Sequence, residues 1–133
     1  TFMQKKIGHV TLLVKNFDEA IEFYTEKAGF FLLTDNHFGN GMRWVTVAPS
    51  KDAQTAIVFV VADTEAKQDR VGTQAANHVF LVVQTDDFYR DYDQMKANGV
   101  HFLSEAKEVP WGIEAVFEDL YGNRLDLVQH NGF

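Results

Sequence analysis

Hydrophobic and polar positions follow the same order in two stretches of the chain. Residues 7–14 (IGHVTLLV) and residues 76–83 (ANHVFLVV) each carry a histidine at the third position, followed by an apolar run. Each stretch then continues into a polar break, an amphipathic segment and a glycine. An internal repeat of this length predicts two copies of one supersecondary unit. We expect the copies to pair and to bring His9 and His78 to a shared cleft.

The first copy, residues 5–61, is predicted to fold as β-α-β-β-β. Alternation over residues 7–14 predicts a strand with one apolar face and one mixed face. Asn16, with Glu19 three residues later, is typical of a helix start. An apolar stripe at helical spacing then runs to Gly29, which is typical of a helix end. The other expected elements are strands at 30–34, 42–48 and 55–61 and a loop at 35–41 (DNHFGNG).

The second copy, residues 77–130, repeats this order. The polar residues 62–76 are expected to connect the copies, with room for a short helical turn. The whole chain, residues 1–133, is therefore predicted to be one α+β domain made of two βαβββ modules. The expected elements of the second module are strands at 77–84, 101–104, 113–118 and 124–129, a helix at 86–98 and a loop at 107–112.

The composition narrows the function classes. A formal net charge of −7 disfavours binding to nucleic acid or to an anionic membrane, because affinity for phosphate comes largely from Lys and Arg. The chain has no cysteine, which excludes disulfides, thiolate chemistry and a Cys-based zinc site and fits a cytoplasmic location. The longest apolar run, residues 56–62, is too short to span a bilayer, and no leader-like apolar segment follows the first residues.

Two longer segments carry a resemblance to a known family. The strand with His9 is followed by NFDEAIEFYTEKAGF, and the chain closes with PWGIEAVFEDLYGNRLDLVQ after NHVFLVV. Over about residues 5–130 the chain resembles the vicinal oxygen chelate superfamily. That superfamily includes the glyoxalases, the extradiol dioxygenases, the fosfomycin-resistance proteins and the bleomycin-resistance proteins. The resemblance implies an eight-stranded arrangement of two modules curved around a cleft, and a homodimer.

The resemblance also implies metal ligands on the first and last strands of each module. Carried over position by position, these are His9, Val58, His78 and Asp126, of which Val58 cannot bind a metal. Two imidazoles and one carboxylate suit Fe²⁺, Mn²⁺, Ni²⁺ or Zn²⁺ and leave open positions for a substrate with vicinal oxygens. Asp126 would then be both ligand and catalytic base. With one acid missing, a dioxygenase or thiol-transferase reaction fits better than the lactoylglutathione lyase reaction.

Several other residues are candidates for contact with a small-molecule substrate. They are Trp111, Trp44, Phe80, Arg43 and His37, whereas Glu114 and Glu118 are expected to face solvent. A second interpretation stays open, in which the chain is a metal-free drug-binding protein of the bleomycin-resistance type. Its acidic balance and its aromatic residues favour that interpretation, and the two histidines count against it. Whether one chain or two build the site is also left open.

Overall fold

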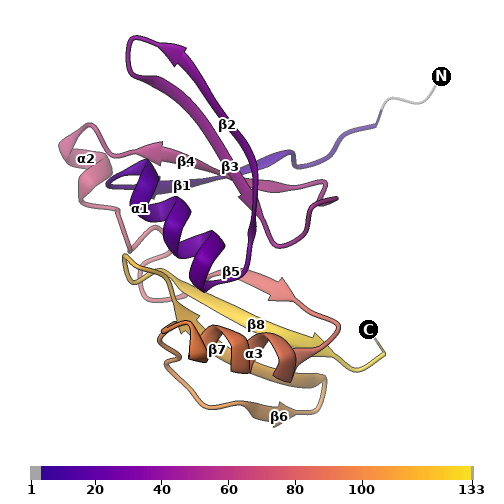
Figure 1. Cartoon of the computed structure of the whole chain (residues 1–133). Coiled ribbons are helices and arrows are strands. Elements are labelled where there is room, and N and C mark those ends of the chain that lie inside the picture. Colours follow the sequence, from indigo (N-terminus) through magenta and orange to yellow (C-terminus); the bar gives the residue numbers. More distant parts are fainter. Residues whose placement is uncertain (1–3, 133) are drawn as a thin grey trace.

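The computed structural model describes residues 4–132 and contains two four-stranded sheets, each with a helix against it (Figure 1). The strand orders are β1-β4-β3-β2 and β5-β8-β7-β6, so the two sheets have the same topology. The predicted α+β class and the βαβββ order of each half are confirmed. The first module contains β1 (His9–Val14), α1 (Phe17–Glu22), the π-helical turn η1 (Phe23–Lys27), β2 (Phe31–Gly39), β3 (Met42–Ala48) and β4 (Ala56–Val61). The second part contains α2 (Glu65–Gln68), β5 (Val79–Gln84), α3 (Phe88–Ala97), β6 (Lys107–Val109), β7 (Gly112–Glu118) and β8 (Arg124–His130).

The first helix begins where the capping pattern predicts. Asn16 Oδ1 accepts a hydrogen bond from Glu19 N at 3.0 Å, which satisfies one of the free N–H groups of the first turn. The last turn widens into η1, which the sequence did not predict. Phe23 and Tyr24 lie on the buried side of that turn. The helical segment thus packs one aromatic face against the core.

The hairpin of β2 and β3 corrects the expectation of a loop at 35–41. β2 extends through Gly39, which pairs with Met42, so that only Asn40 and Gly41 form the turn. Both have positive φ, 54° and 75°, as the tightest hairpin turns require. An Asn-Gly pair is a strong hairpin signal. The turn that it forms here allows the polar residues before it to pair with β3 as a strand.

In the first sheet β3 and β4 pair over only a short part of their length. β1 and β4 pair in register from His9 with Ala56 to Val14 with Val61, whereas β3 and β4 pair only at Thr46 with Val58 and at Val47 with Ile57. β3 therefore separates from β4 on the side that leads to the β2–β3 turn. This separation leaves an apolar space beside Trp44.

The second sheet corrects two further expectations. Residues 101–104 form no strand and contribute only an isolated bridge between Phe102 and Phe117. The expected loop at 107–112 contains strand β6 instead, paired with β7. Gly112, with φ of 155°, closes that hairpin, and a Cβ on it would lie 2.0 Å from the carbonyl oxygen of Gln129. Only glycine fits this position.

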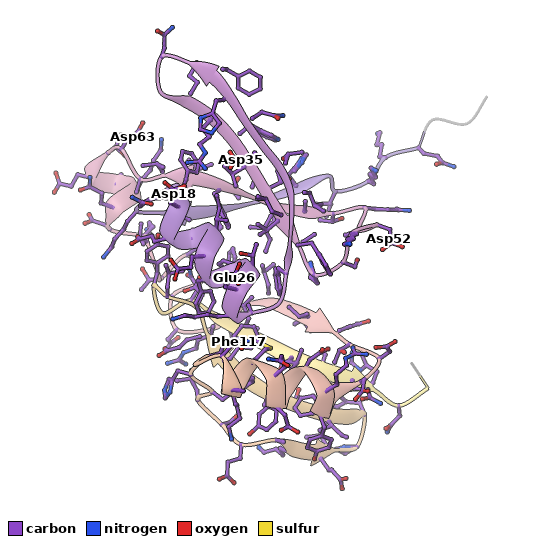
Figure 2. All side chains as sticks on the ribbon, in the orientation of Figure 1. Asp18, Glu26, Asp35, Asp52, Asp63 and Phe117 are labelled. Carbon is purple, nitrogen blue, oxygen red and sulfur yellow. The ribbon has the colours of Figure 1, made fainter. Side chains whose placement is uncertain are left out.

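The modules share one core, in which α1 and η1 of the first module lie against the second sheet (Figures 1 and 2). Tyr24 is fully buried and donates its hydroxyl proton to Asp119 Oδ2 at 2.7 Å. Asp119 Oδ1 also accepts from the backbone N–H groups of Tyr121 and Asn123, each at 2.9 Å. The turn before β8 is therefore fixed to the first module by a buried carboxylate.

The connection between the modules also holds β1. The side-chain amide of Gln74 accepts from Leu13 N at 2.6 Å and donates to Thr11 O at 3.1 Å, as a neighbouring strand would. Gly72 approaches so closely that a Cβ there would lie 2.0 Å from the carbonyl oxygen of Tyr121. Among residues 4–132, no helix has the length and apolar character needed to cross a membrane.

Candidate functional site

His9 lies on the face of the first sheet that is turned away from α1. Leu12 and Val14 point into the core, and His9 is exposed on the opposite side of the strand. Its ring contacts Trp44 edge to face, with ring centroids 5.3 Å apart. In the first sheet Val58 of β4 lies between Thr11 of β1 and Thr46 of β3. Strands β4 and β3 therefore present small and apolar side chains around His9. The face can thus hold an imidazole and an apolar group side by side.

A pocket of about 550 Å³ opens beside Trp44, where β3 separates from β4. Its walls are mostly apolar, and the side chain of Trp44 is 42% exposed, which leaves much of its ring available for contact. Its apolar lining residues include Phe17, Phe38, Met42, Trp44, Val58 and Val60, and the charged residues Arg43, Asp63 and Lys67 line it as well. A pocket of this size and character suits a flat, drug-sized molecule.

Asp126 lies on the corresponding open face of the second sheet. Leu125 and Leu127 on either side are buried in the core, so Asp126 points away from it. Its Oδ1 is buried and has no hydrogen-bond partner among the described residues. The pKa of Asp126 is raised to about 7, chiefly by burial and then by the hydrogen bond and the negative charge of Glu114. An orphaned buried carboxylate oxygen is rare and requires an explanation.

His78 precedes β5 and is exposed at its beginning. Its Nδ1 lies 3.0 Å from the carbonyl oxygen of Val79, and the backbone before it is held by Arg124, which donates to Asn77 O at 2.8 Å. Strict alternation would place His78 on the same face as Val82. The register instead shifts between Val79 and Leu81, which interrupts that alternation.

The strand register changes which residue corresponds to Asp126 in the first module. Asp126 pairs with Val82, four residues after His78, and the residue four after His9 is Leu13, which pairs with Val60. Counted in this way, Val60 corresponds to Asp126, whereas the sequence alignment of the two modules gave Val58. Neither valine can bind a metal ion, so the expectation that the first module lacks an acid at this position is unchanged.

The three expected ligands are not gathered within one chain. His9 belongs to the first sheet, and His78 and Asp126 belong to the second. Across residues 4–132 there is no group of three or more His, Asp or Glu side chains placed to hold one metal ion. Within one chain the two histidines do not share a cleft, because the modules pack through α1 and leave both open faces outward. A shared cleft built by two chains is the other alternative that the sequence left open.

Arg43, one of the expected substrate-binding residues, is held by contacts within the first module. Arg43 forms two parallel hydrogen bonds to Asp35, each of 2.8 Å, and a 3.0 Å ion pair with Asp18, and its guanidinium stacks 5.3 Å from the ring of Phe17. The pKa of Asp35 is lowered chiefly by the hydrogen bonds from Arg43. Figure 2 shows Asp18 and Asp35 near each other on α1 and β2. The contacts of Arg43 hold the hairpin to the helix.

The remaining expected contact residues lie in different environments. His37 is exposed on the outer part of β2, with Nε2 3.5 Å from Asp35 Oδ1. Phe80 lies at the irregular start of β5 and packs against the core. Trp111 is 53% exposed in the β6–β7 turn. Trp44 and Arg43 line the pocket between β3 and β4, and Trp44 is the one of the two whose ring contacts His9.

Sequence reasoning missed Glu114. It was expected to face solvent, but it is half-buried and lies diagonal to Asp126 in the pairing of β7 with β8. The available signal was its place in the apolar segment Gly112–Phe117, where alternation puts Glu114 on one face with Val116 and opposite Ala115 and Phe117. A carboxyl group at such a position lies on the open face of the sheet.

Two βαβββ modules that present open sheet faces define the glyoxalase class of folds. The chain belongs to the Glyoxalase/Bleomycin resistance protein/Dioxygenase superfamily, whose family model matches residues 6–127.

Similar proteins agree with this assignment. An uncharacterized protein of Shewanella frigidimarina (strain NCIMB 400) is 41% identical over 130 residues, which cover 97% of this chain and 96% of that protein. The metallothiol transferase FosB of Staphylococcus haemolyticus (strain JCSC1435) is 26% identical over 135 residues, which cover 98% of this chain and 86% of that protein. The crystal structure of TnmS3, an antibiotic binding protein from Streptomyces sp. CB03234, superposes with a TM-score of 0.80 at 30% identity and covers 98% of this chain and 100% of that one.

Proposed function

We propose that this protein binds and activates a small molecule with vicinal oxygens through a divalent metal ion held by His9, His78 and Asp126. Two imidazoles and a carboxylate are a ligand set that first-row divalent metals accept while keeping positions open for a substrate. A metal bound there supplies a Lewis acid that polarises an oxygen of the substrate. The similarity to FosB, a metallothiol transferase, supports the use of a metal.

The observation that carries the proposal is the unpaired Oδ1 of Asp126. This oxygen is buried without a hydrogen-bond donor, and leaving a buried carboxylate oxygen without a partner is costly. A metal ion would give the oxygen a partner and would lower the pKa of the carboxyl group from about 7, because a nearby cation favours the charged form. The carboxyl therefore has the environment that fits a metal ligand.

The site requires two chains in this proposal. His9 lies on an open face of the first sheet, and Asp126 lies on an open face of the second. Within one chain α1 stands between the modules, so a second copy must bring the first sheet of one chain to the second sheet of the other. Such a dimer is isologous and contains two equivalent sites.

The test is metal content and metal-dependent stability of the purified protein. We expect close to one Mn²⁺, Ni²⁺, Zn²⁺ or Fe²⁺ per chain and a rise in melting temperature on metal addition. A hundredfold excess over the dissociation constant corresponds to about 2.7 kcal/mol of stabilisation. His78→Ala should lose both effects, whereas His101→Ala, at an exposed histidine near Glu118, should keep them. A wild-type protein without bound metal and without a thermal shift would exclude this function.

A metal-free function has its own supporting observation, the apolar pocket beside Trp44. The pocket and the similarity to the antibiotic binding protein TnmS3 favour the binding of a flat aromatic compound. In that case a bleomycin-like compound quenches tryptophan fluorescence and raises the melting temperature in the presence of a chelator. Trp44→Leu should abolish the quenching, and Trp111→Leu, in the distant β6–β7 turn, serves as the control. A response that a chelator removes assigns the binding to the metal site instead.

A further inference from the structure

A further cavity, of about 540 Å³, lies between the two modules, away from His9 and Asp126. The first module contributes the end of η1 and the beginning of β2, and the second contributes the end of β5 and one side of α3 (Figure 1). Val83 in its wall pairs with Leu127, which is buried in the core, so this wall is on the face of the second sheet opposite Asp126. The cavity is therefore separate from the proposed metal site.

The inner wall of this cavity is apolar. Phe30, Met95 and Leu127 line it and are buried. Phe31 lines it as well, but its side chain is 39% exposed, so part of the ring is open to a ligand. Lys51 Nζ lies 5.3 Å from the centroid of that ring, which places a positive charge beside the aromatic surface. A flat apolar group can be covered on several sides in such a space.

Hydrogen bonds join the modules along one side of the cavity. Asn98 Nδ2, just after α3, donates to Lys27 O at 3.3 Å, and Gln94 Nε2 donates to Asn98 Oδ1 at 3.2 Å. Lys27 ends η1 and Gln94 lies on α3, so these bonds fix the two walls relative to each other. The cavity is therefore largely formed before a ligand enters, as small-molecule sites usually are.

The charges that line the cavity favour an anion. Its two acids are already paired with Arg90, which lies 3.1 Å from Asp86 Oδ1 and 3.0 Å from Asp91 Oδ1. Lys27, by contrast, is exposed at the edge of the cavity and forms no ion pair with any residue in the range 4–132. Its ammonium group is thus available to a carboxylate that enters beside it.

We propose that this cavity between the modules binds a flat aromatic monocarboxylate, with its ring between Phe31 and the buried inner wall and its carboxylate on Lys27. The net charge of −7 opposes an anion at long range, so burial of the aromatic ring supplies most of the affinity and Lys27 selects the carboxylate. The site needs neither a metal ion nor a second chain and is independent of the function proposed above. Because the ligand contacts both modules, its binding stabilises the folded chain.

Calorimetric titration with 2-naphthoate and with its uncharged amide, both in the presence of a chelator, tests this site. We expect one naphthoate per chain with a Kd of about 1 mM or tighter, as the usual affinity per ligand atom indicates, and weaker binding of the amide. Lys27→Gln should weaken naphthoate binding by about 3- to 10-fold and leave the amide unchanged. Phe31→Ala should weaken both ligands by about tenfold, because the aromatic contact is lost. Lys5→Gln, at another exposed lysine, is the matched control and should stay within about twofold of the wild type.

Three results would overturn the inference. The first is a wild-type protein that gives neither heat nor a rise in melting temperature with naphthoate. The second is equal affinity for naphthoate and its amide, or an unchanged affinity in Lys27→Gln, since either excludes recognition of the carboxylate. The third is loss of binding in Trp44→Leu, which would assign the ligand to the pocket beside Trp44. The melting temperature of each variant checks the fold, and Phe31→Leu replaces Phe31→Ala if the latter does not fold.

Discussion

The hydrogen bond between Tyr24 and Asp119 should make a large contribution to stability, because it joins the two modules in the shared core. The Tyr24 hydroxyl is fully buried and its 2.7 Å bond ends on a carboxylate. Hydrogen bonds to charged groups contribute about 1.5–3 kcal/mol. We therefore expect Tyr24→Phe to lower the free energy of unfolding by about 2 kcal/mol, with no change in secondary structure.

Asp119→Ala should cost more, because Asp119 accepts four hydrogen bonds. The donors are the Tyr24 hydroxyl and the Tyr121 and Asn123 backbone N–H groups, together with the Asn123 side-chain amide at 2.9 Å. Removing the carboxylate leaves these buried donors without partners, and we expect a loss of about 3–5 kcal/mol. The same reasoning predicts strong coupling. In the Asp119→Ala background the Tyr24 hydroxyl has no acceptor, so adding Tyr24→Phe should cost nothing or restore stability.

Urea unfolding followed by circular dichroism, at one fixed protein concentration, measures all four corners of this cycle. Tyr89→Phe is the control, since that side chain is 49% exposed and its change should stay within about 0.5 kcal/mol. If Tyr24→Phe costs no more than Tyr89→Phe, or if the two core changes simply add, the hydrogen bond does not hold the modules together and the reasoning is refuted.

Three further predictions concern the site and its frame. In an equimolar mixture of His9→Ala and Asp126→Ala chains, half of the randomly formed dimers are mixed and each contains one intact site. Metal content should therefore return to about a quarter of the wild-type value, whereas a site within one chain would give none. The pKa of Asp126 is about 7 in the folded chain against 3.8 in the unfolded chain, so the folded chain binds this proton more tightly. The stabilisation that this proton contributes to the metal-free protein is fully present below about pH 4 and falls as the pH rises to about 7. This rise in pKa corresponds to about 4 kcal/mol of stability, which the partial exposure of Asp126 reduces to about 1–2 kcal/mol. Thermal melts of chelator-treated protein at pH 5 and pH 8 measure the loss of stability, which Asp126→Asn should not show. Gly112→Ala should lower the free energy of unfolding by at least about 2 kcal/mol in urea, because its Cβ would overlap the Gln129 carbonyl oxygen, whereas Gly132→Ala, with open space at its Cβ, should cost less.

The elements that depend on local chemistry followed from the sequence. The repeat predicted two modules of equal topology, and the Asn16 cap set the start of the first helix. The predictions were wrong for the segments whose structure depends on which strand they pair with. The polar residues 35–39 are strand because β3 pairs with them across the Asn40-Gly41 turn. Residues 101–104 are not strand because β6, at 107–109, forms the edge of the second sheet. Hydrophobic pattern alone does not choose between such neighbours.

The candidate site was predictable residue by residue but not as an assembly. Strand alternation correctly placed His9 and Asp126 on faces turned away from the helices. The bulge after His78 and the shift from Val58 to Val60 arise from strand register, which single-sequence periodicity does not determine. Glu114 was missed because a charged residue in an apolar strand was assigned to solvent by its type alone. The packing of α1 between the modules depends on long-range contacts that no motif encodes.

The Gln74 amide bears on how copies of this chain can meet. An edge strand with unpaired backbone N–H and C=O groups can pair with a strand of another polypeptide, which is a common route to uncontrolled aggregation. By occupying Leu13 N and Thr11 O, one glutamine side chain withdraws this part of β1 from such growth. Pairing of another chain with this part of β1 is thereby disfavoured, whereas the sheet faces that carry His9 and Asp126 stay open to contact.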